Sequence, residues 1–278
     1  MFRKFNFIIL LSCMVAVEMF AQEKIELWPG KVPGEVKSKA ADVFQADRDN
    51  NVTRISEVTN PVLEVFAPKP INSNGIGMIV CPGGGYGILA IDKEGYEIAQ
   101  WLTEHGYTVF LLHYRVPQKK DGALQDAQRA MRIVRSKARN YALNKIGIMG
   151  FSAGGSLSAR LSTRYAENLY EKVSDIDTLS ARPDFAALIY PAYLDQGENR
   201  SLTPELKLDQ NTPPMFMFET ADDPYGNSAL VMAGALRDAK VPVELHYLPF
   251  GGHGYGLRPV NDAAKAWPEL LLRWIGKL

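Results

Sequence analysis

A serine set between glycines carries the clearest chemical signal in this sequence. The apolar residues 146–149 lead into the pattern Gly-x-Ser-x-Gly, which is centred on Ser152, and residues 153–161 that follow have helical character. A serine held on a sharp strand-to-helix turn projects its hydroxyl away from the backbone. Glycines must flank it, because side chains there would collide with the strand or the helix. The pattern therefore predicts a nucleophile elbow, the turn that presents a serine for acyl transfer.

Three further segments with suitable chemistry each follow a strand-like run. In chain order they are the glycine-rich loop 82–86, the pair Asp222 and Asp223, and His253 in the glycine-rich loop 251–256. Functional loops gather at the carboxyl ends of the strands of a parallel sheet. We therefore expect the four segments to meet at one edge of the sheet, with a triad in the chain order serine, aspartate, histidine.

Acyl-transfer chemistry gives each of these side chains a role. Neutral Ser152 needs a base to take its proton as it attacks a carbonyl carbon, and the imidazole of His253 can take and return a proton near pH 7. A carboxylate holds that imidazole in the right tautomer. Asp223 is favoured for this task over Asp222, since one of the two adjacent aspartates is expected to cap the following turn or helix.

The negative oxygen of the tetrahedral intermediate needs hydrogen-bond donors that are already in place. The N–H of Ala153 follows the nucleophile and is one expected donor, and the glycine loop is expected to supply others from Gly84 and Gly85. The loss of one such donor typically costs roughly 2.7–4 kcal/mol of transition-state stabilisation.

The elements that must position these loops alternate along the chain. Expected strands cover 52–58, 62–66, 76–81, 107–114, 145–150, 185–190, 215–219 and 243–248, and expected helices cover 94–105, 123–142, 153–165, 228–239 and 263–275. Apolar strands separated by helices predict an α/β-hydrolase fold, a mostly parallel central sheet with helices on both faces and two antiparallel strands leading in. The segment between residues 190 and 215 is too short for a large cap domain.

Composition excludes several classes of function. The chain has 278 residues, 46% of them hydrophobic and 22% charged, with a formal net charge of zero, so no electrostatic footprint for nucleic acid or anionic membrane is present. The length fits one catalytic domain over 22–278. No histidine spacing of a metal site occurs in the sequence, and we expect neither a metal nor a cofactor.

The N-terminus has the layout of a secretory signal peptide. Arg3 and Lys4 precede an apolar stretch over 7–17, and a cleavage site after Ala21 makes 1–21 the signal. The stretch is shorter than the roughly 20 residues that a membrane span needs, so we expect export to the periplasm or beyond without stable membrane insertion. Lipidation at Cys13 is the weaker alternative.

The motifs together resemble the hormone-sensitive-lipase-like and bacterial acetylxylan-esterase-like α/β-hydrolases from about Pro61 to the C-terminus. The resemblance rests on the serine elbow and the histidine loop, on Pro82-Gly83-Gly84-Gly85-Tyr86, on His113-Tyr114-Arg115, and on Asp126 with Arg129-Ala130. The acid loop departs from the family pattern, because 222–228 is shortened. The resemblance implies a carbohydrate O-acetyl esterase.

Three tyrosines beside the catalytic loops, Tyr86, Tyr225 and Tyr255, are either sugar-stacking side chains or structural aromatics that close the loops. An uncapped site suits a bulky substrate such as a decorated oligosaccharide or polysaccharide. The alternative hypotheses for the function are a feruloyl or general short-chain carboxylesterase, a peptidase of the prolyl-oligopeptidase type, and a non-catalytic glycan-binding relative.

Overall fold

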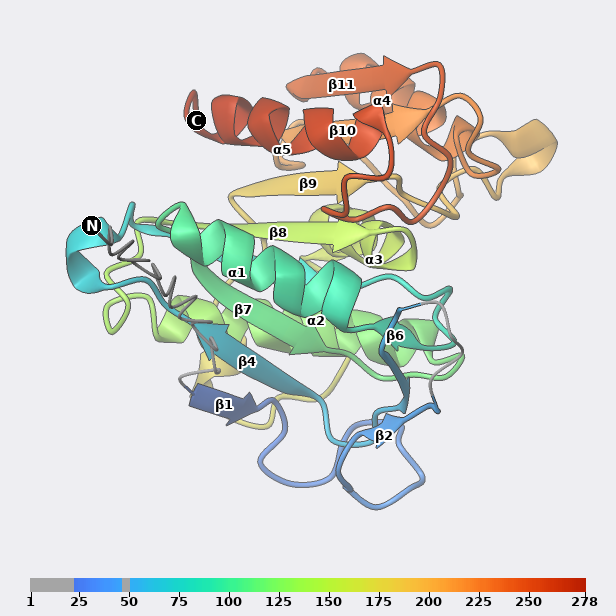
Figure 1. The fold of residues 1–278 in the computed structure, drawn as a ribbon. Coiled ribbons are helices and arrows are strands. Elements are labelled where there is room, and N and C mark those ends of the chain that lie inside the picture. Colours follow the sequence, from blue (N-terminus) through green and yellow to red (C-terminus); the bar gives the residue numbers. More distant parts are fainter. Residues whose placement is uncertain (1–22, 47–50) are drawn as a thin grey trace, which may run out of the picture.

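An eight-stranded sheet runs through the middle of the protein (Figure 1). The computed structural model describes residues 23–46 and 51–278, so the predicted signal peptide lies outside the described residues. In spatial order the strands are β1 (Glu23–Glu26), β4 (Val62–Phe66), β7 (Thr108–His113), β5 (Ile76–Cys81), β8 (Lys145–Phe151), β9 (Phe185–Ile189), β10 (Met215–Thr220) and β11 (Val243–Leu248). Neighbours from β7 to β11 are parallel, whereas β4 runs antiparallel to β1 and β7.

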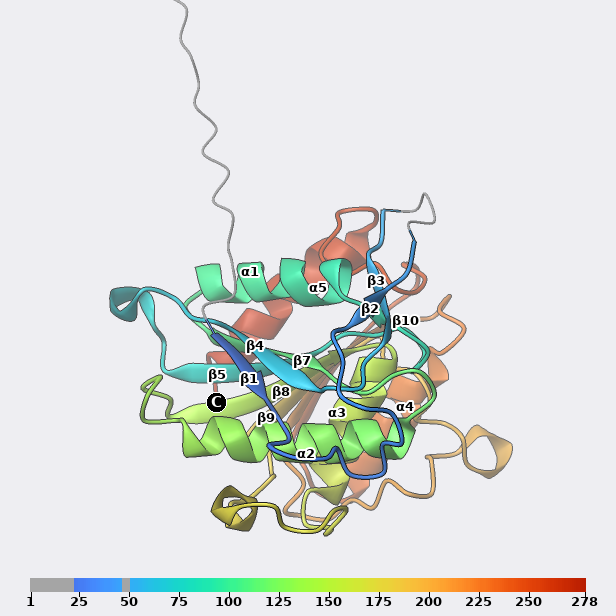
Figure 2. The same ribbon diagram turned by 90° about the horizontal axis from the view of Figure 1, so that it is seen from below.

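Helices cover both faces of this sheet (Figure 2). On one face lie α1 (Glu97–Glu104), which follows a π-helical turn at Asp92–Tyr96, and α5 (Asp262–Ile275); on the other lie α2 (Lys120–Ser136), α3 (Ala153–Arg164) and α4 (Asn227–Asp238). Short 3₁₀ turns occur at Pro70–Asn72, Asp175–Thr178 and Glu198–Arg200. The predicted fold class is confirmed, and between β9 and β10 the chain forms only the last of these turns.

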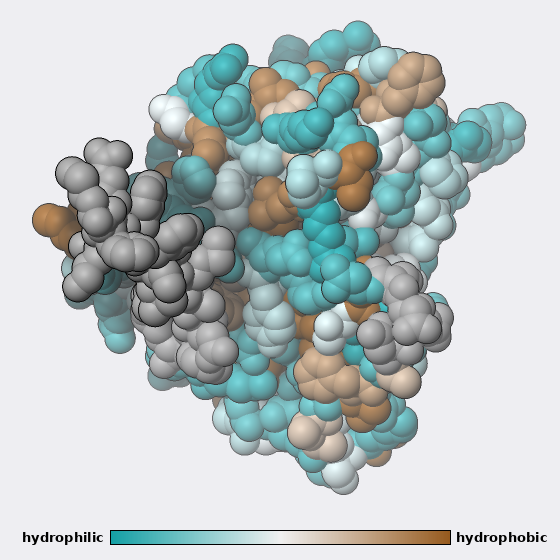
Figure 3. Space-filling model, viewed as in Figure 1, coloured by the Kyte–Doolittle hydropathy of each residue, from teal (hydrophilic) through white to brown (hydrophobic). Residues whose placement is uncertain are grey.

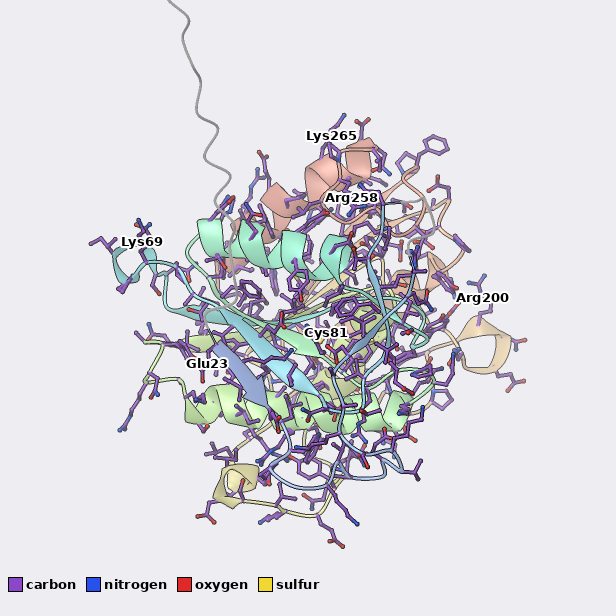
Figure 4. The ribbon with its side chains drawn as sticks, turned by 60° about the horizontal axis from the view of Figure 1, so that its bottom comes forward. Glu23, Lys69, Cys81, Arg200, Arg258 and Lys265 are labelled. Atoms are coloured by element: carbon purple, nitrogen blue, oxygen red, sulfur yellow. The ribbon has the colours of Figure 1, made fainter. Side chains whose placement is uncertain are left out.

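The central strands are apolar because both faces of the sheet are covered. All residues of β7 and β9 are buried, as are all but the first of β5 and β8, so no polar alternation marks them. Cys81 ends β5 in the middle of the fold (Figure 4). Burial raises the pKa of its thiol to about 12, which fits a small core residue and not a nucleophile.

The start of the chain differs from the prediction. The expected strand 52–58 does not lead into the main sheet. Instead β3 (Arg54–Glu57) pairs with β2 (Val43–Phe44) and β6 (Leu89–Ala90) in a separate three-stranded sheet. The edge strand β1 was not predicted, because Glu23-Lys24-Ile25-Glu26 holds one apolar residue and gives no hydrophobic pattern. Helix α2 begins at Lys120, three residues before the predicted start, and ends at Ser136 instead of at residue 142.

A buried ion pair ties the N-terminal segment to the sheet and to α2. Arg115 Nε lies 2.9 Å from Asp126 Oδ2, and both side chains are almost wholly buried. The other carboxylate oxygen of Asp126 accepts a hydrogen bond of 2.8 Å from the indole N–H of Trp28. Burial raises the pKa of Asp126, and the Arg115 charge opposes that rise.

The molecular surface mixes polar and apolar residues. On the face seen in Figure 3, brown apolar residues are scattered among polar ones and do not merge into one broad patch. Among residues 23–46 and 51–278, no helix has both the length and the apolar character needed to cross a bilayer.

Candidate active site

The turn between β8 and α3 holds Ser152 in a strained conformation. Its φ of 52° and ψ of −118° lie outside the regions that side-chain-bearing residues favour. A Cβ on Gly150 would lie 2.0 Å from the carbonyl oxygen of Gly154, and a Cβ on Gly154 would lie 2.0 Å from that of Cys81. Both glycines are therefore required by close backbone approach, as the elbow pattern implies.

Three side chains from separate strand ends form one hydrogen-bonded chain. His253 Nε2 lies 2.7 Å from Ser152 Oγ, and His253 Nδ1 lies 2.5 Å from Asp223 Oδ2. The Asp223 side chain is fully buried, whereas that of His253 is 24% exposed. Asp223 Oδ1 also accepts a hydrogen bond of 2.7 Å from the N–H of Tyr225, which fixes the orientation of the carboxylate. This arrangement has the geometry of a nucleophile, a base and an orienting acid.

The neighbouring aspartate has a different position. Asp222 is exposed and accepts hydrogen bonds from the N–H groups of Gly252, at 2.9 Å, and Gly251, at 3.2 Å. These bonds, that from Gly252 first, hold the pKa of Asp222 below its usual range. Asp222 thus shapes the backbone of the histidine loop, whereas Asp223 contacts the imidazole.

The glycine loop lies beside the serine, and Gly84 and Gly85 line the same cavity as Ser152. The N–H of Gly83 donates to Glu94 Oε2 at 2.9 Å, so it is already used. Ala153 begins α3, and the first N–H groups of a helix have no partner within it. The structure therefore places all three predicted oxyanion-hole residues around the serine.

A buried glutamate that was not predicted connects the glycine loop to the histidine loop. Glu94 accepts the Gly83 N–H through one oxygen and the Tyr190 hydroxyl, at 2.9 Å, through the other. That hydroxyl accepts in turn from the N–H of Gly256 at 3.0 Å. The chain of bonds runs from the glycine loop to the histidine loop. Glu94 was not predicted because a glutamate in an expected amphipathic helix is ordinary.

A cavity of about 420 Å³ opens above Ser152 and His253. Its wall comes from the glycine loop, from the three-stranded sheet and from two tyrosines; the lining residues are Val52, Arg54, Gly84, Gly85, Ile88, Ala90, Lys93, Glu94, Ser152, Tyr193, Tyr225 and His253. The three-stranded sheet thus completes the site that the main sheet positions.

For two of the three tyrosines the structure supports the second alternative, a structural aromatic that closes a loop. Tyr86 is wholly buried, and its hydroxyl donates to Ser156 Oγ at 3.3 Å. Tyr255 is 4% exposed and packs against the Tyr190 ring with centroids 4.6 Å apart. Neither lines the cavity, so both are structural aromatics that support the loops. Tyr225 does line it, beside Tyr193, which was not predicted; their ring centroids are 5.3 Å apart.

The remaining histidines have local partners away from the cavity. His105 Nδ1 lies 2.8 Å from the Trp101 carbonyl, His113 Nδ1 lies 2.7 Å from Asp42 Oδ2, and His246 Nε2 lies 3.0 Å from Glu244 Oε1. The described part of the chain contains no group of three or more His, Cys, Asp or Glu side chains that could hold a metal ion.

The sheet, the elbow and the hydrogen-bonded chain define an α/β-hydrolase with a serine-centred site. Residues 63–190 match the BD-FAE family model. The chain is 31% identical over 215 residues to an acetylxylan esterase of Xylanibacter ruminicola, a match that covers 67% of this chain and 42% of the relative. It is 32% identical over 214 residues to endo-1,4-beta-xylanase B of Butyrivibrio fibrisolvens, covering 66% of this chain and 33% of the relative.

A solved structure resembles the whole fold. The acetyl ester-xyloside bifunctional hydrolase of Caldicellulosiruptor lactoaceticus superposes with a TM-score of 0.73 at 28% identity, over 94% of this chain and 98% of that one. The chain therefore has the α/β-hydrolase fold and is similar to acetylxylan-esterase-like members of that class, in agreement with the predicted resemblance. It spans less than half of the length of the two curated relatives it matches.

Proposed function

We propose that this protein is a serine esterase that removes O-acetyl groups from xylan or related plant oligosaccharides. The observation that carries the proposal is the chain of hydrogen bonds from Ser152 through His253 to Asp223, which opens onto the cavity. The similarity to an acetylxylan esterase and to an acetyl ester-xyloside hydrolase supports the choice of ester.

In the first half of the reaction, Ser152 Oγ attacks the acetyl carbonyl carbon while its proton passes to His253 Nε2. Asp223 accepts the hydrogen bond from Nδ1–H and stabilises the imidazolium that forms. The N–H groups of Ala153 and of Gly84 or Gly85 donate to the negative oxygen of the tetrahedral intermediate. The sugar hydroxyl then leaves with the proton from His253.

In the second half, water hydrolyses the acetyl-serine. His253 removes a proton from the water as the oxygen attacks the carbonyl, and it returns the proton to Ser152 as acetate leaves. The histidine must be neutral at both attacks, because only a neutral imidazole can accept the proton.

Two features of the cavity support a carbohydrate ester. Tyr193 and Tyr225 expose aromatic surface beside His253, as a platform against which a sugar ring can pack. The short turn-bearing segment between β9 and β10 leaves the cavity without a large cap, so a substituted oligosaccharide has room to approach. The N-terminal residues support export of the protein, which would bring the enzyme to such polymers.

The test is the release of acetate and ferulate from acetylated and feruloylated xylan, with p-nitrophenyl acetate and a peptide amide as parallel substrates. We expect acetate release, ester turnover well above amide turnover, and loss of nearly all activity in Ser152→Ala. Preferential release of ferulate would show that the enzyme removes feruloyl and not acetyl groups. Faster turnover of the amide than of the ester would contradict the proposed esterase activity. A folded protein without turnover would identify a binding protein.

A further inference from the structure

A second carboxyl group lies behind the triad acid. Glu219 is the fifth residue of β10, four positions before Asp223, and none of its surface is exposed. One carboxyl oxygen accepts the N–H of Thr220 at 2.9 Å, and the other, Oε2, is buried without a hydrogen-bond partner among the described residues. The Glu219 carboxyl is within hydrogen-bonding reach of Asp223.

The surroundings of Glu219 do not suit a negative charge. Asp222 and Asp223 approach it from the following loop, Tyr247 from β11 and Tyr255 from the histidine loop. The charged residues of the packed helices α4 and α5 are exposed on their outer sides: Arg237, Asp238, Asp262, Lys265, Glu269 and Arg273. Within 23–46 and 51–278, no ion pair involves Glu219. A buried carboxylate without a cation is costly, whereas a neutral acid can donate a hydrogen bond.

We propose that Glu219 is held as a neutral carboxylic acid whose O–H donates to Asp223, and that it is a positioning residue for the triad. In this arrangement the proton gives the orphaned oxygen a partner. Asp223 then accepts from the Tyr225 N–H, from His253 and from Glu219. A carboxylate with fixed donors on both oxygens cannot rotate away from the imidazole.

The electrostatics agree with this geometry. Burial, followed by the charge of Asp223, raises the pKa of Glu219 to about 9. At neutral pH the pair therefore carries a single negative charge, which faces His253. Deprotonation of Glu219 at alkaline pH removes the donor and places a second negative charge beside the first.

The sequence offers a matched set of variants. Glu219→Gln keeps the shape and an N–H donor for Asp223 but has no titrating proton. Glu219→Leu removes the donor. Glu244→Gln, on the neighbouring strand, is the control for loss of a half-buried carboxylate elsewhere.

The direct test is infrared difference spectroscopy at pH 7 between the wild-type protein and Glu219→Gln. We expect the wild type to show the C=O band of one more protonated carboxylic acid than the variant, and we expect Glu244→Gln to leave that band unchanged. Asp126, whose pKa burial also raises, contributes equally to all three proteins. An unchanged band in Glu219→Gln would overturn the proposal. This measurement needs no substrate, so it stands or falls separately from the proposed esterase function.

The kinetic test rests on the proposed function. We expect Glu219→Gln to keep kcat within about threefold and Glu219→Leu to lower it about tenfold or more at unchanged KM, because a hydrogen bond to a charged group is lost. Wild-type kcat should decline above about pH 9, and Glu219→Gln should lack that decline. Equal impairment of the two variants, or the same alkaline decline in both proteins, would contradict a donor role. If Glu219→Leu does not fold, the infrared band and the pH profile of Glu219→Gln still decide.

Discussion

Two buried glutamates support the site, one beside the glycine loop and one beside the triad acid, and their surroundings differ. Glu94 is 3% exposed and accepts hydrogen bonds from two separate segments, the Gly83 N–H and the Tyr190 hydroxyl. Glu219 is equally buried but accepts only from the next residue of its own chain and faces an aspartate. Two buried glutamates therefore have different roles, because Glu94 has two hydrogen-bond donors from other segments and Glu219 has none in the part of the chain that the structure describes.

The difference shows how the two halves of the site are held. On the oxyanion side, Glu94 is an acceptor that joins the glycine loop to the histidine loop through Tyr190. On the acid side, Asp223 is the hydrogen-bond acceptor, and donors from its neighbours hold its carboxylate in place. Replacement of the glutamate by glutamine should accordingly lower kcat much more on the oxyanion side than on the acid side.

The largest expected effect separates the two adjacent aspartates of the acid side. Asp223→Asn should lower kcat by about 10⁴-fold, because an amide cannot hold the imidazole in the productive tautomer. Asp222→Asn should cost far less, since it weakens only the hydrogen bonds from Gly251 and Gly252. Steady-state kinetics of both variants check this, and a larger loss in Asp222→Asn would transfer the acid role.

The second effect is expected on the oxyanion side. In Glu94→Gln one of the two acceptor oxygens becomes an NH₂ group, which faces either the Gly83 N–H or the Tyr190 hydroxyl. We expect kcat to fall by about 10- to 100-fold, since the glycine loop is no longer fixed. Glu104→Gln, at the exposed end of α1, is the control. Full activity in Glu94→Gln would mean that the loop holds its position without this bridge.

The third effect concerns stability against pH on the acid side. The pKa of Glu219 in the folded protein, about 9, lies above that of an exposed glutamate, so the unfolded chain loses this proton first. Its contribution to stability is fully present below about pH 4 and is lost as the pH rises towards 9. The melting temperature of Glu219→Gln should therefore increase relative to that of the wild type as the pH rises. A constant difference between the two would contradict the shifted titration.

The smallest effect is expected where the two sides meet. Tyr255 packs on Tyr190, the partner of Glu94, and its hydroxyl is buried with no hydrogen-bond partner among the described residues. Tyr255→Phe removes that hydroxyl, so kcat/KM should change less than about twofold and stability should stay the same or rise slightly. A higher KM for acetylated oligosaccharides, with kcat unchanged, would instead make Tyr255 a sugar contact.

The parts of the site that the sequence predicted are those with strong local constraints. Gly150 is required by a backbone contact only four residues away, with Gly154, and the elbow pattern includes both glycines. The central strands are apolar because both faces are buried. Which of the two adjacent aspartates contacts His253 could be seen only in the structure, because the conformation of the loop decides which of the two side chains faces the imidazole. The small sheet, Glu94 and Tyr193 depend on contacts between distant segments, and such contacts leave no periodic pattern in one sequence.

Covalent labelling tests most directly whether Ser152 is the nucleophile of an acetyl esterase. The wild-type protein, inactivated with an organophosphonate, is digested and its adduct is located by mass spectrometry while p-nitrophenyl acetate turnover is followed. We expect one adduct, on the peptide that contains Ser152, in proportion to lost activity, and none in Ser152→Ala. An adduct at another residue that tracks the loss, or labelling that persists in Ser152→Ala with activity, would contradict the account.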